Sequence, residues 1–554
     1  MAKRLLAPHY VLESSWEVCN KVGGIYTVLS TRAKSLVEKL GDQVIFIGPD
    51  VWTNTDNQLF KENRSLLADW RKHAQRVDGL HVRIGRWTIP GNPIAVLVDF
   101  SSFYEHKNEI YTWAWEEYGV DSLHAYGDYD EASMFSWGAG KVVESYYRYF
   151  GLQRSDHVVY QAHEWMTGLG ALYVKKMCPA VATIFTTHAT TIGRSIAGNG
   201  KPLYDQLGCY NGDQMARELN VESKHSIEKQ CAHHVDCFTT VSRITDCECR
   251  QLLEKPADVV LMNGFENDFV PKAGKAFDAA RKRARTKLLK VANALMGTSL
   301  GNDTVIVSIG GRYEYKNKGI DMFVDAMNRL RHDARLNKNV LAFVLVPAWV
   351  KEARHDLQVN LAKKGTDNLP CGDTRITHCL NNQETDSVLN QMNWLGMHNH
   401  PFDPVKLIFV PCYLDGKDGI FNLHYYDLLI GMDLCVYPSY YEPWGYTPLE
   451  SVAFHVPCIT TDLTGFGLWA NEVKGANSEL EDGVKVVHRS DYNFDRAADE
   501  IRNAVLEYTQ QDSSSVKNIR HNAANIAEKA LWKHFITYYE QAWDMALRKV
   551  KAVK

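Results

Sequence analysis

Short apolar segments alternate with amphipathic ones along most of this 554-residue sequence, and that alternation is the strongest constraint on its fold. The segment "YVLESS" at 10–15 precedes the glycine-bearing loop "NKVGG" and then "IYTVLSTRAKSLVEKL" at 25–40, whose apolar residues recur at helical spacing. The run "QVIFIGP" at 43–49 completes a β-strand, α-helix, β-strand unit. Further apolar runs, typical of buried parallel strands, occur at 157–163, 182–188, 237–242 and 259–264.

A second series of the same kind follows a charged helical stretch at 272–297, with apolar runs at 304–311, 339–348, 405–411, 434–439, 457–462 and 483–489. The sequence therefore predicts an α/β fold with two Rossmann-like, doubly wound domains facing a deep interdomain cleft. We expect residues 1–270, joined by a C-terminal helix at about 530–554, to form one domain and 271–529 the other. Residues 351–405 are long for a connection, so we expect a helical insertion there.

Composition excludes several classes of protein. The formal net charge of −4 gives no general attraction for nucleic acid. The first apolar run stops at Pro8 and no window approaches 18 apolar residues, so we expect no membrane segment and a cytoplasmic protein with reduced cysteines. Cys231, His233, His234 and Cys237 are metal-ligand types, but no second pair completes a zinc site, so we expect them to be structural.

The loop "NKVGGIYTV" is the first candidate for ligand binding. Gly23 and Gly24 lie between a predicted strand and a predicted helix, where the backbone can approach a ligand closely and helix N–H groups can face it. That arrangement suits a phosphate or a sugar. It is equally the pattern of a plain tight turn before a helix, and the motif alone does not decide between the two.

The segment "SIGGRYEYKNKG" at 308–319 brings positive charge to a strand end. A predicted strand ends at Gly310 and Gly311, Arg312 follows, and Lys318 comes just before a helix. A guanidinium offers a planar fork to phosphate oxygens and an ammonium offers a point charge. The segment is not a Walker phosphate loop, and its alternative interpretation is a turn with two exposed cations.

The segment "YYEPWGYTPLE" at 440–450 places two carboxylates around the start of a helix. Thr447 suits the N-cap and Pro448 the first helical position. The positive end of such a helix favours a diphosphate, which would repel Glu442 and Glu450. These two acids would therefore accept hydrogen bonds from neutral sugar hydroxyls, unless they are merely solvated or capping groups.

Taken together, "KVGG", "HEW", "FTTHATTIGR", "GRYEYKNKG" and "YEPWGYTPLE" resemble the glycogen synthases of the animal and fungal type, in order from about residue 10 to about residue 545. The resemblance implies a retaining glycosyltransferase of the GT-B fold. It would transfer glucose from UDP-glucose to the non-reducing 4-hydroxyl of an α-1,4-glucan such as glycogen. The alternatives are the same reaction with ADP-glucose, or a non-catalytic glucan-binding scaffold.

The resemblance also implies roles for individual residues. Glu442 would hold the donor glucose, Arg312 and Lys318 would neutralise the departing diphosphate, and His188 would lie beside the transferred sugar. The donor-binding residues would be Glu450 (at the ribose), Tyr425 (stacked on the uracil), Trp444, Gly445, Tyr446, Thr447, Gly310, Gly311, Lys21, Gly23, Gly24 and Arg194, and the acceptor side would comprise His163, Glu164 and Asn263.

The implied mechanism needs neither cofactor nor metal. Arg312, Lys318 and the helix near Thr447 would stabilise the charge on the leaving group. No residue is identified by the sequence as the carboxylate nucleophile that a retaining glycosidase uses. Similar enzymes are described with front-face attack, in which the leaving phosphate takes the proton of the acceptor hydroxyl.

The chain departs from the animal and fungal pattern near its C-terminus, where that family carries an arginine-rich helix that binds glucose 6-phosphate. The matching stretch at 518–549 keeps Arg520, and its next arginine is Arg548. We therefore expect no strong activation by glucose 6-phosphate and no phosphorylation switch. The 351–405 insertion matches the helices that form oligomers in that family, although it is shorter, so a homotetramer is expected.

Overall fold

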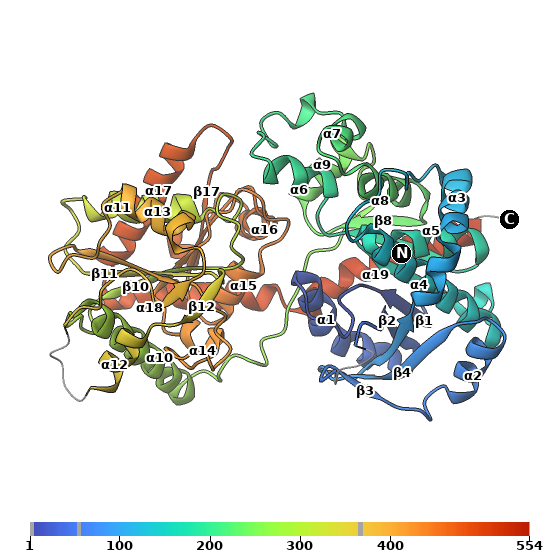
Figure 1. Cartoon of the computed structure of the whole chain (residues 1–554), viewed down its shortest axis with the longest axis horizontal. Coiled ribbons are helices and arrows are strands. Elements are labelled where there is room, and N and C mark those ends of the chain that lie inside the picture. Colours follow the sequence, from blue (N-terminus) through green and yellow to red (C-terminus); the bar gives the residue numbers. More distant parts are fainter. Residues whose placement is uncertain (1–4, 53–56, 364–368, 553–554) are drawn as a thin grey trace. The chain divides into compact units, whose positions relative to one another are not determined.

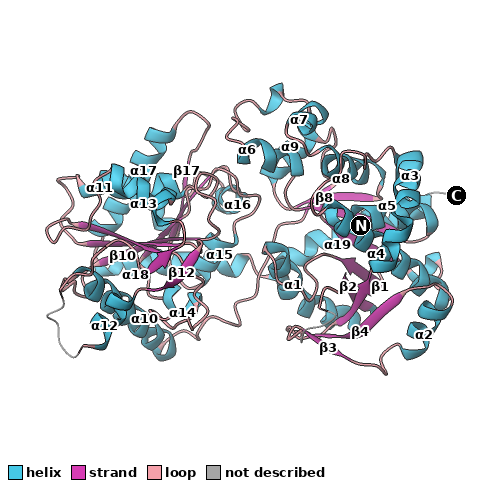
Figure 2. Cartoon of the chain, in the orientation of Figure 1, coloured by secondary structure: helices cyan, strands magenta, loops and turns pink. Residues whose placement is uncertain are grey.

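The computed structural model describes residues 5–52, 57–363 and 369–552. Its internal contacts divide the chain into two compact units, called unit 1 (Met1–Glu266 with Ala530–Lys554) and unit 2 (Asn267–Lys529). Helices and parallel strands alternate in both units (Figures 1 and 2), so the predicted fold class, two doubly wound α/β domains, is confirmed.

Unit 1 is built on a nine-stranded sheet of order β3-β4-β5-β2-β1-β6-β7-β8-β9. The strands are β1 (Tyr10–Ser14), β2 (Val44–Pro49), β3 (Phe60–Glu62), β4 (His81–Trp87), β5 (Ile94–Asp99), β6 (Val158–His163), β7 (Ala182–Thr187), β8 (Cys237–Thr240) and β9 (Val259–Val260). The strands β3, β4 and β5 were absent from the predicted pattern, and β4 pairs antiparallel with both of its neighbours. The predicted strand at 259–264 shrinks to two residues.

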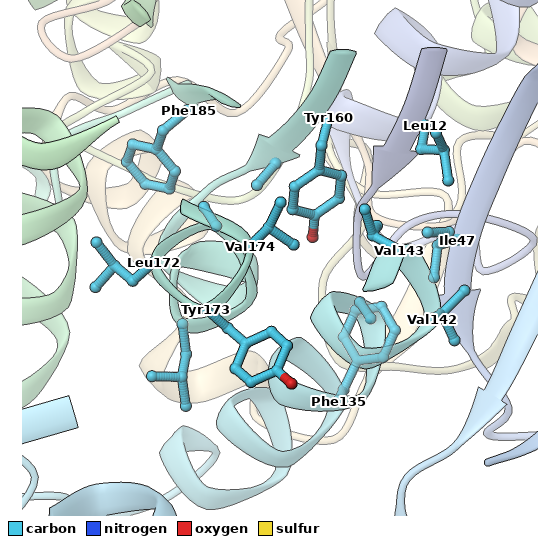
Figure 3. Packing of buried hydrophobic residues seen from close by; sticks show 14 of the residues in the cluster. Leu12, Ile47, Phe135, Val142, Val143, Tyr160, Leu172, Tyr173, Val174 and Phe185 are labelled. Carbon is cyan, nitrogen blue, oxygen red and sulfur yellow. The ribbon is translucent and has the colours of Figure 1, made fainter. Parts of the chain in front are cut away.

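Alternation along β1 assigns its side chains to opposite faces of the sheet. Leu12 packs in the apolar core between the sheet and helices α4 (Tyr129–Tyr149) and α5 (Gly168–Met177). In Figure 3, Phe135 and Val142 of α4 and Val174 of α5 point into this core together with strand residues. Glu13 therefore points to the other face, toward α1 (Gly24–Leu40) and α19 (Trp532–Ala552). The remaining helices of unit 1 are α2 (Ala68–Arg76), α3 (Lys107–Tyr118), α6 (Thr191–Gly198), α7 (Gly212–Glu218), α8 (Glu222–His234) and α9 (Arg243–Leu252).

The C-terminal helix α19 belongs to unit 1, because its first turn is fixed there. The Trp532 side chain is fully buried, and its Nε1–H donates to Thr31 Oγ1 of α1 at 2.8 Å. A Cβ atom on Gly264 would lie 2.8 Å from the Trp532 ring, so glycine at that position leaves room for the indole. Phe265 and Leu531 pair as an isolated bridge beside it.

Unit 2 contains a six-stranded parallel sheet of order β14-β11-β10-β15-β16-β17. Its strands are β10 (Val305–Gly310), β11 (Val340–Leu345), β14 (Val405–Val410), β15 (Leu434–Val436), β16 (Cys458–Thr461) and β17 (Val484–Val487). Its helices are α10 (Lys275–Met296), α11 (Ile320–Arg331), α12 (His355–Ala362), α13 (Ser387–Trp394), α14 (Tyr425–Leu429), α15 (Tyr446–Ala453), α16 (Gly465–Lys474), α17 (Phe494–Gln510) and α18 (Ser513–Lys529). All six strands were predicted as apolar runs, because strands buried on both faces are apolar along nearly their whole length.

The predicted helical insertion at 351–405 is only partly helical. It contains the short helices α12 and α13, but β12 (Val350–Ala353) pairs antiparallel with β13 (His378–Leu380). Residues 364–368 of the insertion lie outside the described residues. Trp394 and Phe402 are 84% and 97% exposed, which is unusual for such large apolar side chains.

The helices of the described part of the chain include none with the length and apolar character needed to span a bilayer.

We expect Trp532→Ala to destabilise unit 1, because the substitution empties a fully buried site and leaves Thr31 without its donor. Comparable truncations of buried tryptophan cost about 3–5 kcal/mol. Thermal unfolding followed by tryptophan fluorescence and circular dichroism would measure the shift. Trp115→Ala is the matched control, because Trp115 is 61% exposed in the same unit. Equal effects of the two substitutions would contradict this account of how α19 is held.

Candidate active site

The two segments of unit 2 that the sequence analysis singled out lie against each other in the fold. The Tyr440 and Tyr441 backbone N–H groups both donate to the Asn317 carbonyl oxygen, at 2.8 and 3.1 Å. Gly319 has φ of +70°, and a Cβ there would lie 2.1 Å from the Pro438 carbonyl oxygen. Glycine is therefore required at position 319 for both its conformation and its small size.

This approach joins Lys318 to Glu442 in an ion pair whose side chains are each only 15% exposed. Lys318 follows β10 in the loop leading to α11, and its N–H donates to the Glu314 carbonyl oxygen at 2.8 Å. Glu442 pairs as a parallel bridge with Thr464, just before α16. Backbone contacts thus fix both ends of the ion pair.

Helix α15 begins earlier than its sequence predicted. Its first residue is Tyr446, and Gly445 occupies the N-cap position with φ of +114°. The predicted N-cap, Thr447, is thus the second helical residue and Pro448 the third. Gly445 can adopt a left-handed conformation, so the helix begins two residues before the start that Thr447 as N-cap would give. Pro448 does not prevent this, because proline is tolerated in the first turn of a helix.

Glu450, one turn into α15, accepts a hydrogen bond from the Tyr426 hydroxyl at 2.7 Å. The Tyr426 ring stacks on Phe269 and Phe454, with centroid distances of 4.9 and 5.2 Å. Burial and the nearby Glu450 carboxylate raise the pKa of Tyr426 above its usual range, so its hydroxyl stays a donor. Tyr426 was not predicted as a site residue, although its position next to Tyr425 in "HYYD" was a signal for it.

Tyr425, which the resemblance assigns to stacking on the uracil, lies beside the end of β10. A Cβ on Gly310 would lie 2.9 Å from the Tyr425 hydroxyl, so this tyrosine packs over the end of β10. Burial raises the pKa of Tyr425 well above its usual value. Gly310 is thus a glycine because the Tyr425 ring occupies the space beside it.

Arg312 points away from the buried pair. Its side chain is 60% exposed and forms an ion pair with Glu314 at 2.9 Å. Exposed pairs of this kind are worth at most about 1 kcal/mol, because water screens the charges and ordering two long side chains is unfavourable. An anion arriving at the end of β10 can therefore attract the Arg312 guanidinium away from Glu314.

Trp444, also predicted as a site residue, is 3% exposed, and its carbonyl oxygen accepts from the Phe466 N–H at 2.8 Å.

In the loop before α1 of unit 1, the backbone N–H groups that could face a ligand bind a carboxylate of the protein. Glu17 Oε2 accepts hydrogen bonds from the backbone N–H groups of Gly23 and Tyr26, at 2.7 and 2.8 Å. Gly24 is the first residue of α1, and Lys21 is exposed with its Nζ 5.5 Å from the centre of the Tyr26 ring. Because a carboxylate faces these N–H groups, the loop suits a neutral sugar better than a phosphate.

A buried histidine cluster lies at the ends of β6 and β7 in unit 1, consisting of Glu13, Arg32, His163, Glu164 and His188. His163 Nδ1 lies 3.0 Å from His188 Nε2, and His163 Nε2 lies 3.3 Å from Glu13 Oε2. Arg32 forms an ion pair with Glu13, and both side chains are fully buried. The sequence predicted His163, Glu164 and His188 but missed the other two. A glutamate within the apolar run "YVLESS" was the available signal, since a buried charge requires a partner.

Glu164 holds the backbone around His188. Its Oε1 accepts from the N–H groups of His188 and Ala189, at 2.8 and 3.0 Å. Glu164 itself has φ of +69°, which is unusual for a residue with a side chain and is often found at functional positions. Burial raises the pKa of Glu164 to about 7, although the charge of Arg194 in α6 opposes the rise.

Two further buried carboxylates, Glu228 and Glu248, fix the segment after β7 and were not predicted. Glu228 accepts hydrogen bonds from the Thr187 hydroxyl and from the Thr191 N–H, the latter at 2.9 Å. Glu248 accepts from Thr190 Oγ1 at 2.5 Å. Burial, with a contribution from the nearby Glu164, raises the pKa of Glu228 to about 8.

Asn263, predicted on the acceptor side, is buried after β9, and its side-chain oxygen accepts no hydrogen bond from the described residues.

One group of metal-ligand types occurs among the described residues, formed by His378, Cys412 and Asp418 of unit 2. His378 Nε2 already lies 2.9 Å from the Asp418 carbonyl oxygen, and its Nδ1 lies 2.8 Å from Thr377 Oγ1. Burial raises the pKa of the Cys412 thiol to about 12. These groups are engaged in holding their own loop, so they do not suggest a metal site.

Arg520, the residue kept from the arginine-rich pattern, lies beside two arginines that come from another helix. Arg281 and Arg285 of α10 donate to the Asp433 carboxylate at 2.5 and 2.7 Å, and Arg520 donates to the Met432 carbonyl oxygen at 3.3 Å. Counting arginines along residues 518–549 alone missed this cluster, because α10 is more than 200 residues away in the sequence.

Comparison with known proteins identifies the family. A family model described as glycogen synthase matches residues 13–365 and 361–553. The chain belongs to the glycogen synthase family. It is 29% identical to the glycogen [starch] synthase of Neurospora crassa over 98% of this chain and 84% of that protein. It is 28% identical to the liver glycogen [starch] synthase of Mus musculus over 99% of this chain and 85% of that protein.

A solved structure supports the fold of this glycogen synthase family member. The catalytic domain of starch synthase IV from Arabidopsis thaliana, bound to ADP and acarbose, aligns with a TM-score of 0.57 at 13% identity and covers 98% of this chain and 100% of that one. The predicted family and the predicted GT-B type of fold are therefore confirmed. The roles assigned to individual site residues stay predictions.

We expect Gly319→Ala to destabilise the protein by about 3 kcal/mol or more, because a Cβ would collide with the Pro438 carbonyl oxygen. Gly475→Ala is the matched control. Gly475 has φ of +75° and open space around it, so alanine there adds only the left-handed strain of about 1–2 kcal/mol. The midpoints of thermal unfolding measure both effects, and equal losses would show that backbone strain alone, without the close approach of the two loops, explains the glycine.

We expect Glu228→Gln to stabilise the protein increasingly as the pH rises from 5 to 8. The pKa of Glu228 is about 8 in the fold against a usual value of 4.5, so the native state keeps a proton that the unfolded chain releases. The stability linked to that proton is complete below pH 4.5 and is lost as the pH rises through 8. Thermal melting at several pH values would measure the difference between the variant and the original protein.

Glutamine resembles the protonated acid and does not titrate, so the variant should be closest to the original protein near pH 5. The exposed Glu105→Gln substitution controls for the change in net charge. A difference between Glu228→Gln and the original protein that does not vary with pH would contradict the assigned burial effect.

Proposed function

We propose that this chain is a retaining glycogen synthase that transfers glucose from UDP-glucose to the non-reducing 4-hydroxyl of an α-1,4-glucan. Membership in the glycogen synthase family supports the reaction class. The observation that carries the site assignment is the Lys318–Glu442 ion pair next to the start of α15. It joins the two motifs that were predicted to hold the diphosphate and the sugar.

The ion pair suggests that donor binding proceeds by an exchange of partners. A nucleoside diphosphate carries more negative charge than one carboxylate, so Lys318 gains by turning from Glu442 to the phosphate oxygens. Glu442 is then left with lone pairs that hydroxyl groups of the donor glucose can satisfy. Arg312 likewise exchanges its exposed ion pair with Glu314 for the phosphate oxygens. The protein thus keeps its charged groups neutralised until the substrate replaces their partners.

The departing diphosphate is the centre of the chemistry. Cleavage of the bond between glucose and the phosphate adds negative charge to the leaving oxygen, and groups aimed at that charge lower the barrier. Lys318, Arg312 and the N–H groups in the first turn of α15 would provide this stabilisation. Pro448 supplies no N–H group there, so Tyr446 and Thr447 are the main backbone donors. These groups supply the positive charge that a metal ion provides in other transferases.

Glu450 and Tyr426 are suited to recognise a neutral part of the donor. A carboxylate bound to a tyrosine hydroxyl can accept a second hydrogen bond, and it would repel phosphate. We assign Glu450 to the ribose hydroxyls. Retention of configuration would come from front-face attack by the glucan hydroxyl, with its proton passing to the leaving phosphate. In this arrangement Glu442 accepts hydrogen bonds from the donor glucose, and the reaction uses no carboxylate nucleophile.

We expect Lys318→Ala to lower the kcat for glucose transfer to glycogen about 100- to 1,000-fold, the usual loss when one group stabilising the transition state is removed. Glu442→Gln should lose activity similarly, because it removes both the charge and the anchor of Lys318. Radiolabelled UDP-glucose and ADP-glucose, each with and without glucose 6-phosphate, would be compared as donors. Transfer from UDP-glucose without stimulation by the sugar phosphate is the expected result.

Lys316→Ala is the matched control, because it removes an exposed positive charge two residues from Lys318. Full activity in Lys318→Ala would overturn the site assignment. A preference for ADP-glucose would replace the donor while leaving the mechanism intact. Glycogen binding with no transfer from either donor would favour a scaffold.

A further inference from the structure

A continuous line of buried polar groups leads from α1 to His188. Arg32 of α1 pairs with Glu13 of β1, Glu13 Oε2 lies 3.3 Å from His163 Nε2, and His163 Nδ1 lies 3.0 Å from His188 Nε2. The Arg32, Glu13 and His163 side chains are fully buried. His188 is 9% exposed and ends the line nearest to solvent.

Arg32 fixes the charge state of Glu13. Burial alone would raise the pKa of Glu13, but the Arg32 charge and the hydrogen bond from His163 outweigh it and hold the pKa below its usual value. Glu13 is therefore a carboxylate and can only accept hydrogen bonds. Arg32 can only donate, and the Tyr539 ring, 4.0 Å from its guanidinium carbon, covers its other side.

The acceptor at Glu13 decides where the protons on both histidines are. His163 must carry its proton on Nε2, which faces the carboxylate. Burial lowers the pKa of His163, so its ring is neutral and Nδ1 has a lone pair. His188 Nε2 must then carry a proton to donate to that lone pair. Burial also holds the pKa of His188 well below its usual value, so its remaining nitrogen, Nδ1, is an acceptor.

The position of the His188 ring is fixed from two directions. Its backbone N–H is bound by Glu164 and its Nε2 by His163. Nδ1 forms no hydrogen bond with the described residues, which leaves it available to a ligand. His188 directly follows β7, His163 ends β6 and Glu13 lies in β1, so three neighbouring strands of one sheet set this geometry.

We propose that Glu13 and His163 are positioning residues that hold His188 in the Nε2-protonated tautomer, so that His188 Nδ1 accepts a hydrogen bond from a hydroxyl group of the transferred sugar. The sugar as ligand rests on the proposed function, whereas the tautomer follows from the buried line alone. The opposite tautomer would present an N–H to the sugar and would favour an acceptor oxygen in place of a hydroxyl donor. The line therefore decides whether His188 Nδ1 offers the substrate a hydrogen-bond acceptor or a hydrogen-bond donor.

Glu13→Met is expected to release both tautomers. Glu13 Oε2 is paired with Arg32 and also faces His163 Nε2, so removing the carboxylate removes the acceptor that keeps the proton on His163 Nε2. Each ring can then carry its proton on either nitrogen. Glu13→Gln is the matched control, because Arg32 would bind the amide oxygen in the place of Oε2 and the same oxygen would accept from His163 Nε2–H, which leaves both tautomers unchanged.

Nitrogen-15 NMR of the full chain labelled at histidine distinguishes the two tautomers, with the His188 signals assigned by their loss in His188→Gln. We expect Nε2-protonated His188 in the original protein and in Glu13→Gln, and a share of Nδ1-protonated His188 in Glu13→Met. A Nδ1-protonated His188 in the original protein, or the same tautomer in all three proteins, would overturn the proposal. The original protein alone provides this test if Glu13→Met does not fold.

Kinetics test the link to the sugar. We expect Glu13→Met to lower kcat about 10- to 100-fold with less than a threefold change in the KM for UDP-glucose, and Glu13→Gln to retain most of the kcat. Unchanged kcat in a variant whose tautomer has changed would remove the role in sugar binding. The NMR measurement needs no substrate, so an original protein that shows the expected tautomer and transfers no glucose would refute the proposed function and leave the tautomer assignment standing.

Discussion

Charged groups at the carboxyl ends of parallel strands must be neutralised within the protein when no substrate is bound, and this constraint shapes both units. A parallel sheet gathers these strand ends at one edge, where ligands bind in such folds. Lys318 is held by Glu442, and Arg312 by Glu314. Glu17 is held by backbone N–H groups of the loop before α1. Each internal partner resembles the chemistry of the ligand that we propose will replace it or bind beside it.

The two units differ in how their charged groups are neutralised. In unit 2 the internal partners are partly exposed side chains, so an incoming anion can reach them. In unit 1 the Arg32–Glu13 partners are fully buried, and removal of one member of a buried ion pair typically costs about 3–5 kcal/mol. The Arg32–Glu13 pair is therefore a permanent part of the structure. This contrast agrees with the separate roles that we propose, in which unit 2 binds and releases phosphate charge and unit 1 supplies fixed hydrogen-bond geometry.

Local patterns in the sequence were sufficient to predict much of the fold and the motifs that meet in the site. The six strands of unit 2 were visible because each is a continuous apolar run, whereas β4 was missed because it mixes charged and apolar residues. Lys318 and Glu442 were each predicted as site residues, but their pairing depends on contacts such as Gly319 against Pro438. The start of α15 was misplaced because the conformation of Gly445 overrides the capping preference of Thr447.

Side chains distant in the sequence explain what could not be predicted. Arg32 is buried because α19 returns to unit 1 and covers the guanidinium with Trp532 and Tyr539, which are 500 and 507 residues further along the chain. An aromatic face attracts a cation while excluding water, so it can complete the surroundings of an arginine whose charge is already paired with Glu13. Water at that position would compete with Arg32 for Glu13 and loosen the line that leads to His188. Helix α19 therefore protects the histidine geometry through Arg32, which gives a physical reason for this helix to fold with unit 1.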